Sequence, residues 1–173
     1  SYGYTGGGLL FWDIKTAKRE LIKDTDIIPE QSTFSLVAIG KNKILGGTTT
    51  NPGTGGEKKA NVAELYIMDI ETKKNDWHQA VFPVAQTYTD MCLGENGLVF
   101  GIVDYKRLFV FDPVRHKLIY DENLVAKYGS ISSGQQQEGP RVFVTAPNGT
   151  IYVLFVKGIA RLDQETYKIN MLA

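Results

Sequence analysis

Aspartates near two apolar runs are the residues of this sequence whose type and spacing could support catalysis. Asp90 lies in the mostly apolar run 88–93, whereas Asp104 precedes Tyr105 and Lys106 in a short polar interruption between two apolar runs. Two carboxylates held roughly 5 to 9 Å apart can cleave a glycosidic bond. Aspartates that only accept hydrogen bonds are far commoner, and the sequence favours that role here.

Amide, aromatic and cationic side chains offer binding chemistry instead. Amides can hydrogen-bond sugar hydroxyls or a peptide backbone, and an exposed tyrosine can stack on either ligand. Most of these side chains fall in segments that separate apolar runs, where binding residues are common. The candidate ligand-binding residues are Asp90, Asp104, Tyr105, Lys106, Gln135, Gln137 and Arg141.

Motifs for nucleophilic, metal or nucleotide chemistry are absent from the sequence. It contains no Gly-x-Ser-x-Gly elbow and no histidine–glutamate zinc motif, and His78 and His116 fall on segments expected at opposite faces. The glycines of 53–56 do not stand between a strand and a helix, as a phosphate-binding loop requires. Cys92 lies in an apolar run, which predicts a buried, inert thiol. We expect no catalytic residue, metal or cofactor, and the choice between enzyme and binding protein stays open with a preference for the latter.

The elements that must position these residues form an internal repeat. Four segments share one pattern, in which four mostly apolar residues lead into an aspartate, with threonine or arginine three positions later and lysine five positions later. Successive aspartates are about 43 to 56 residues apart, which suits the roughly 40 to 50 residues of a propeller blade. Each aspartate is expected to open a turn by accepting backbone hydrogen bonds. The four aspartates are Asp13, Asp69, Asp112 and Asp163.

A second repeat predicts a hairpin upstream of each later aspartate. The turns lie at 40–43, 94–97 and 147–149, and the last two contain Asn-Gly, a strong hairpin signal because both residues tolerate positive φ. We name the strands of each unit A to D, so that these are A–B hairpins and the aspartates open C–D hairpins.

The two repeats together predict an all-β fold, a β-propeller of four-stranded antiparallel blades. Blades are expected at 33–80, 85–121 and 140–173, and residues 1–23 would form an incomplete blade with strands B, C and D. A propeller closes when one terminus supplies a strand to the blade of the other, but this sequence ends on strand D. We therefore expect about three and a half blades that belong to a larger propeller. A second chain that completes the propeller is one of the expected partners. A four-bladed ring lacking one strand is the alternative.

The repeats resemble several propeller families. The run 9–13 resembles the end of a WD repeat, although the other copies have Met68, Phe111 and Leu162 in place of its tryptophan. The segment 44–77, with its double glycine, is similar to a kelch repeat. The pattern of strand, aspartate, turn and strand is also similar to quinoprotein-type repeats. The turn glycine of those repeats is replaced here by Ala17, Lys73, His116 and Tyr167. The resemblance covers nearly the whole chain and implies the fold, but no activity.

Charge and loop length narrow the function. The chain has 173 residues with 19 basic and 19 acidic side chains and no block of like charge, so nucleic acid and membrane surfaces are not expected as partners. The long connections all fall on the face that carries the B–C and D–A connections, and long segments on a rigid scaffold often bind ligands. These connections are 24–33, 48–62, 78–86 and 121–139.

We expect from this distribution a non-catalytic module that binds a carbohydrate, a peptide or a protein at the B–C and D–A face. A piece of a propeller enzyme acting on polysaccharide and a structural spacer are the alternatives. The sequence carries no signal for a compartment, and an extracytoplasmic location is only a guess.

Overall fold

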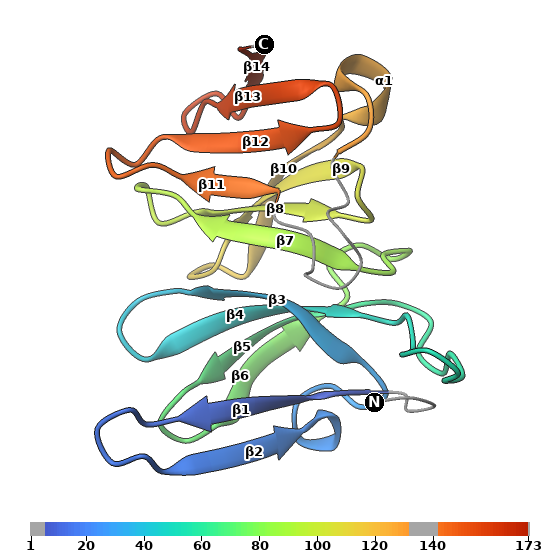
Figure 1. Ribbon diagram of the computed structural model, residues 1–173, viewed down its shortest axis with the longest axis vertical. Helices are drawn as coiled ribbons and strands as arrows, with labels where there is room; N and C mark the ends of the chain where they lie inside the picture. The colour runs from blue at the N-terminus through green and yellow to red at the C-terminus, as the bar shows by residue number, and fades with distance from the viewer. Residues whose placement is uncertain (1–5, 132–141, 173) are drawn as a thin grey trace.

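The chain folds into four antiparallel sheets that follow one another from the N-terminus to the C-terminus (Figure 1). This computed structural model describes residues 6–131 and 142–172, so the candidate residues Gln135, Gln137 and Arg141 lie outside the described residues. We call the sheets blades 1 to 4. Blade 1 contains β1 (Gly8–Trp12) and β2 (Arg19–Lys23). Blade 2 contains β3 (Ser32–Ala38), β4 (Lys43–Thr49), β5 (Leu65–Asp69) and β6 (Lys74–Gln79).

Blades 3 and 4 repeat the four-stranded unit. Blade 3 contains β7 (Tyr88–Leu93), β8 (Val99–Val103), β9 (Arg107–Asp112) and β10 (Lys117–Asn123). Blade 4 contains β11 (Phe143–Thr145), β12 (Ile151–Phe155), β13 (Gly158–Leu162) and β14 (Ile169–Met171).

Each complete blade is a meander in which every strand pairs with the next one along the chain. The four strands are therefore A to D in chain order, and β1 and β2 are strands C and D of blade 1. The expected strand B of blade 1 would fall on residues 1–7, of which only 6 and 7 are described. The helical elements that the structure describes are η1 (Asp24–Asp26) and α1 (Val125–Tyr128). None of the described helices has the length and apolar character that crossing a membrane requires.

The hydrophobic core lies between successive blades. Successive side chains of a strand point to opposite faces of the sheet, and in a central blade both sets are apolar. Such a blade therefore presents one apolar face to the preceding blade and the other to the following blade. Three buried clusters result, one at each junction. The cluster between blades 2 and 3 contains Leu65 and Ile67 from one blade and Phe109 and Phe111 from the other. This arrangement explains why the strands read as nearly continuous apolar runs.

The C–D turns are held by their aspartates, as the repeat predicts. The carboxylate Oδ1 of Asp69 accepts hydrogen bonds from the backbone N–H of Glu71 and Thr72 at 3.0 and 2.8 Å. Asp13, Asp112 and Asp163 accept the same pair, from the residues two and three positions on. The residue after this pair has a positive φ of 53° to 61° in every copy, where quinoprotein-type repeats have glycine. These residues are Ala17, Lys73, His116 and Tyr167.

The A–B turns differ in detail from the expected Asn-Gly geometry. Only the glycines, Gly97 and Gly149, have positive φ, at 77° and 80°, whereas the asparagines before them do not. The asparagine side chains act instead as acceptors, because Asn96 Oδ1 and Asn148 Oδ1 each accept the backbone N–H two residues on. The asparagines thus stabilise these turns through their side chains, and only the glycines use positive φ.

Candidate functional site

A cavity of about 620 Å³ opens on the face that carries the B–C and D–A connections, next to blade 3. Three of the predicted site residues, Asp104, Tyr105 and Lys106, line it. Asp90 does not line it. The remaining lining residues come from the connection after β4, the connection before β7 and the strands of blade 3. They are Asn51, Phe82, Val84, Ala85, Gln86, Thr87, Val103, Arg107 and Asn123.

The turn between β8 and β9 builds one wall of the cavity in an uncommon backbone conformation. Asp104 and Tyr105 both have positive φ, 52° and 57°, and Lys106 N donates to Val103 O at 3.2 Å. Two successive positive φ values are typical of a type I′ turn, in which Asn-Gly is usual and tyrosine is not. Left-handed backbone costs a non-glycine residue about 1 to 2 kcal/mol, so neighbouring contacts must hold this turn in place.

Those contacts come from the adjacent connection and from β7. Asp104 Oδ1 accepts hydrogen bonds from the backbone N–H of Gln86 and Thr87 at 2.8 and 2.9 Å. Tyr105 N donates to Thr89 Oγ1 at 3.0 Å. The carboxylate thus joins the β8–β9 turn to the segment before β7, and it fixes the position of the half-buried Tyr105. Burial raises the pKa of the Tyr105 phenol, so the hydroxyl is neutral at pH 7 and can donate a hydrogen bond.

The long connection 50–64 is tied to the same place through Gln86. The Gln86 side chain accepts from Thr50 Oγ1 at 2.9 Å and from Lys58 Nζ, and its amide group donates to Asn61 O at 3.0 Å. Asn51 Nδ2 donates to Thr87 Oγ1 at 3.2 Å. These contacts anchor the start of the connection at Thr50 and Asn51 and its second half at Lys58 and Asn61. The wall of the cavity is therefore formed by fixed backbone.

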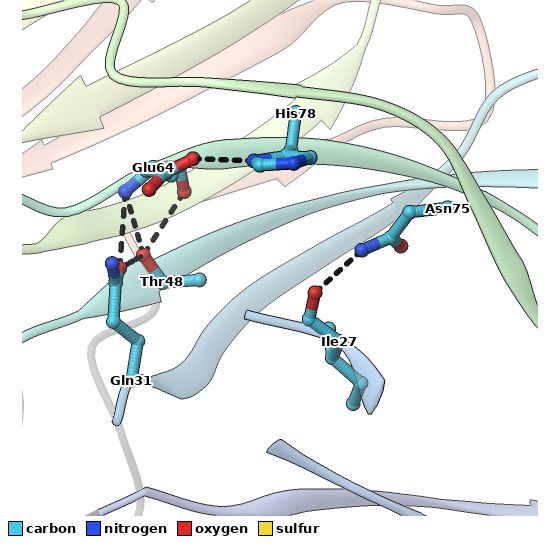
Figure 2. A network of polar contacts seen from close by, with 6 residues as sticks. All are labelled: Ile27, Gln31, Thr48, Glu64, Asn75 and His78. Atoms are coloured by element: carbon cyan, nitrogen blue, oxygen red, sulfur yellow. Dashed lines mark hydrogen bonds and ion pairs between the residues drawn. The ribbon is translucent and has the colours of Figure 1, made fainter. Parts of the chain in front are cut away.

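A polar network closes the same connection on the side of blade 2 (Figure 2). Thr48 Oγ1 donates to Gln31 Oε1 at 2.5 Å, and Glu64 N donates to Thr48 Oγ1 at 2.7 Å. Glu64 Oε2 lies 2.7 Å from Nδ1 of His78, on β6. The ends of three strands and the segment before β3 are joined in this way, and the structure uses His78 as a partner of a carboxylate.

Asp90 has a structural position at the junction between blades 3 and 4. Its Oδ2 accepts the backbone N–H of Val142 and Phe143 at 2.7 and 2.9 Å, and its Oδ1 accepts that of Met91 at 2.9 Å. Asp90 and Asp104 therefore bind separate sets of backbone donors at different segments. Each carboxylate thus holds backbone of the scaffold in place.

The cavity is suited to binding because it combines several kinds of side chain. Val84 and Phe82 provide apolar surface, and Tyr105 provides an aromatic ring. Lys106 supplies a cation, whereas Arg107 is already paired with Asp121. Among residues 6–131 and 142–172, no group of three or more histidine, cysteine, aspartate or glutamate side chains could hold a metal ion.

Another cavity, of about 690 Å³, lies on the face of the A–B and C–D turns, between blades 2 and 3. Ile39 and Leu93 line it together with Val114, which is largely exposed. His116 also lines it and stacks on Trp77, with ring centroids 4.9 Å apart. The sequence predicts only tight turns on this face, and no pattern in it predicts a cavity between two of these turns.

Cys92 and three residues of the cavity can be compared directly with what the sequence predicts. Burial raises the pKa of the Cys92 thiol, which agrees with the expected inert cysteine. The sequence missed Asn51, Gln86 and Arg107 as residues of the cavity. Their positions in polar connections or at a strand start were a signal, but only the fold shows that these segments converge.

Comparisons with known proteins support the fold. No protein-family model matches the sequence, and no curated protein is significantly similar to it. Among solved structures, the β-propeller domain of Cps50 (Swd1) from Myceliophteria thermophila has a TM-score of 0.61 at 12% identity, over 94% of this chain and 51% of that chain. Sqt1 from Saccharomyces cerevisiae has a TM-score of 0.64 at 10% identity, over 95% of this chain and 42% of that chain.

A bacterial structure gives the same result. The extracellular domain of the putative one component system BT4673 from B. thetaiotaomicron has a TM-score of 0.65 at 11% identity, over 96% of this chain and 22% of that chain. The chain thus spans about half or less of the length of these structures. At such low identity the likeness concerns the fold alone. The chain has a β-propeller fold of about three and a half blades and matches no single propeller family.

Proposed function

We propose that this chain is a non-catalytic binding module, and that it holds a peptide segment of a partner protein in the cavity beside Tyr105. The observation that supports this proposal is the composition of that cavity on an anchored backbone. A peptide presents alternating apolar side chains and backbone amides. The cavity offers apolar surface at Val84 and Phe82, with polar groups from Asn51 and Asn123 around it.

Tyr105 is the residue that we expect to contribute most. Aromatic side chains dominate binding energies because they bury a large apolar area and still offer a hydroxyl. The β8–β9 turn fixes the Tyr105 backbone before a ligand arrives, so little conformational entropy is lost on binding. Lys106, next to it, would favour an acidic peptide, because its cation has no salt-bridge partner among the described residues.

A peptide array and a glycan array, both probed with the intact chain, test this proposal. We expect binding on the peptide array, and we expect Tyr105→Ala to weaken it by about tenfold or more, which corresponds to roughly 1.4 kcal/mol. Alanine at this position keeps a left-handed backbone with a Cβ atom, so the unfolding free energy should change little.

Val114→Ala is the matched control, because Val114 is an exposed side chain of the other cavity on the opposite face. It should bind peptides as the unmodified chain does. Loss of binding in Val114→Ala with normal binding in Tyr105→Ala would show that the opposite face is the binding face. Selective binding on the glycan array would instead favour a carbohydrate ligand, and binding to neither array would favour the role of a spacer.

A further inference from the structure

A single side chain, that of Gln86, contacts three residues of the long connection 50–64. Its Oε1 accepts hydrogen bonds from Thr50 Oγ1 at 2.9 Å and from Lys58 Nζ. Its Nε2 donates to Asn61 O at 3.0 Å and to a backbone carbonyl of the segment before it at 3.2 Å. A glutamine amide offers two acceptor sites and two donor hydrogens, so these contacts use both groups fully. We call the contacts of Gln86 with Thr50, Lys58 and Asn61 the latch.

Gln86 also belongs to the cavity beside Tyr105. Its backbone N–H donates to Asp104 Oδ1 at 2.8 Å, and Gln86 lines the cavity together with Asn51. Asn51 directly follows Thr50, so the contact between the Thr50 hydroxyl and Gln86 helps to hold this lining residue in place. The connection and a ligand in the cavity therefore meet at the same residue.

The middle of the connection is not held by burial in the core. None of residues 51–60 is buried, and three of them are glycines. A segment that buries few apolar side chains opens at a small cost in free energy, because opening it exposes little additional apolar surface. Polar contacts such as those of the latch must therefore keep the connection closed.

We infer that Gln86 is a positioning residue, which latches the connection 50–64 against the cavity so that closure of the latch and ligand binding favour each other. This inference rests on the proposed function, since the ligand is the peptide held beside Tyr105. With the latch closed, Asn51 and Gln86 are ordered before the peptide arrives, so less conformational entropy is lost on binding. The coupling is reciprocal, and a bound peptide therefore shifts the connection toward its closed state by the same free energy.

The rate of trypsin cleavage after Lys58 and Lys59 measures the latch, because both lysines are exposed and a protease cuts a segment that has opened. Gln86→Met keeps the length of the side chain and removes its hydrogen bonds, so we expect cleavage without peptide to be at least about fivefold faster. With the tightest-binding peptide of the array bound, cleavage of the unmodified chain should slow, whereas cleavage of Gln86→Met should not change. Equal cleavage rates of the two chains without peptide would overturn the latch.

Two neighbouring lysine variants separate the coupling from a direct contact between Gln86 and the peptide. Lys58→Met removes one contact of the latch, yet Lys58 does not line the cavity, so we expect this variant to weaken peptide binding by at least about twofold. Lys59→Met is the matched control, because it removes the same charge from an exposed residue that takes no part in the latch. It should bind the peptide as the unmodified chain does, and equal affinities of the two variants would overturn the coupling.

Gln31→Ala is the control for a loss of stability that leaves the latch intact. Gln31 binds Thr48 at the base of the same connection, and Thr48 also bonds directly to Glu64 (Figure 2). This variant should be less stable in urea but should bind the peptide normally, since Gln31 does not line the cavity.

The failure of this inference is distinct from the failure of the proposed function. Normal peptide binding with equal cleavage rates would overturn the latch and leave the proposed function standing. A chain that binds no peptide would overturn the proposed function and the coupling with it, whereas the cleavage rates without peptide decide the latch on their own. If Gln86→Met does not fold, Lys58→Met takes its place in the cleavage measurement, where trypsin cuts after Lys59.

Discussion

Two buried tyrosines, Tyr66 and Tyr88, differ in the hydrogen bonding of their hydroxyl groups. Both side chains are fully buried. Tyr66 belongs to the cluster between blades 1 and 2, and Tyr88 belongs to the cluster between blades 2 and 3. The Tyr66 hydroxyl lies 2.8 Å from Thr33 Oγ1, and burial raises the pKa of its phenol to about 12. Burial also raises the pKa of Tyr88, whose hydroxyl makes no hydrogen bond of good geometry among the described residues and lies only near the backbone N–H groups of Phe82 and Val81.

Replacing each tyrosine by phenylalanine should separate the two cases. Tyr66→Phe removes a hydrogen bond and leaves Thr33 without it, so we expect the unfolding free energy to fall by about 1 kcal/mol. Tyr88→Phe removes a polar group that is buried without a well-formed hydrogen bond, so we expect no loss, or a gain of up to about 1 kcal/mol. Urea unfolding measures both. A larger loss for Tyr88→Phe than for Tyr66→Phe would contradict this account.

At the residue scale the sequence could predict only part of the candidate site. Tyr105 and Lys106 stand out because they interrupt two apolar runs in a single short turn. The role of Gln86 depends on three segments that meet only after the blades have stacked. Asp104 accepts hydrogen bonds from two backbone N–H groups of the segment before β7. No local pattern encodes such a contact between segments that are 17 to 18 residues apart in the sequence.

At the scale of a strand pair, the larger side chain of one cross-strand pair lies on strand C in blade 3 and on strand B in blade 4. In blade 3, Gly101 lies opposite Phe109, and a Cβ atom on this glycine would lie 2.2 Å from the phenyl ring. In blade 4, the same pair is Val153 and Ala160. In blade 3 the side chain of strand C fills the space next to this pair, whereas in blade 4 the side chains of strands B and C share it.

A double-mutant cycle that transfers the blade 4 pair into blade 3 tests this exchange. Gly101→Val alone should overpack the junction and cost about 1 to 3 kcal/mol, and Phe109→Ala alone should leave a cavity and cost about 3 to 5 kcal/mol. The double variant should be more stable than the sum of the two losses predicts, by at least about 1 kcal/mol, because the valine fills space left by the ring. Additive losses in urea unfolding would show that the two sites do not share this space.

At the element scale the sequence was informative, because strand, turn and repeat are local features. The aspartates and the glycines located the A–B and C–D turns of blades 2 to 4. The same information could not reveal that Gly46 makes room for the Tyr66 ring, which a Cβ atom would approach to 2.0 Å. The double glycine that resembles a kelch repeat therefore has a packing explanation in this chain. Packing across a sheet depends on the partner strand, and this is why motif comparison alone did not find it.

At the scale of the whole molecule, the blades are joined by a few polar contacts as well as by the apolar clusters. Asp90 of β7 binds the backbone at the start of blade 4, and Lys73 of the β5–β6 turn pairs with Glu20 of blade 1 at 3.1 Å. These contacts fix the relative position of neighbouring blades, which nonpolar contacts alone specify less strictly. The sequence predicted the order of the blades, but it could not predict these junctions.

The C–D turns make the stability of the whole molecule sensitive to acid, because the same carboxylate contact recurs in several blades. Backbone N–H groups hold the pKa of each of three turn carboxylates below its usual value of 3.8. A folded-state pKa below the unfolded value means that the stabilisation is fully present above the unfolded pKa and is lost as the pH falls through the folded pKa. We therefore expect the unfolding free energy to be constant from pH 7 to about 5 and to decrease below about 4. The three carboxylates are those of Asp13, Asp69 and Asp163.

Urea unfolding at a series of pH values measures this decrease, and Asp163→Asn isolates the contribution of one turn. Asparagine keeps an oxygen that can accept the backbone N–H of Thr166 and Glu165, but it does not titrate. The variant should therefore lose less stability between pH 5 and pH 3 than the unmodified chain does. Lys168→Gln, a change in the same hairpin that removes a charge of the opposite sign, is the control and should keep the full pH dependence. Equal slopes for Asp163→Asn and the unmodified chain would show that the turn carboxylate does not contribute, and the acid sensitivity would then have to come from other groups.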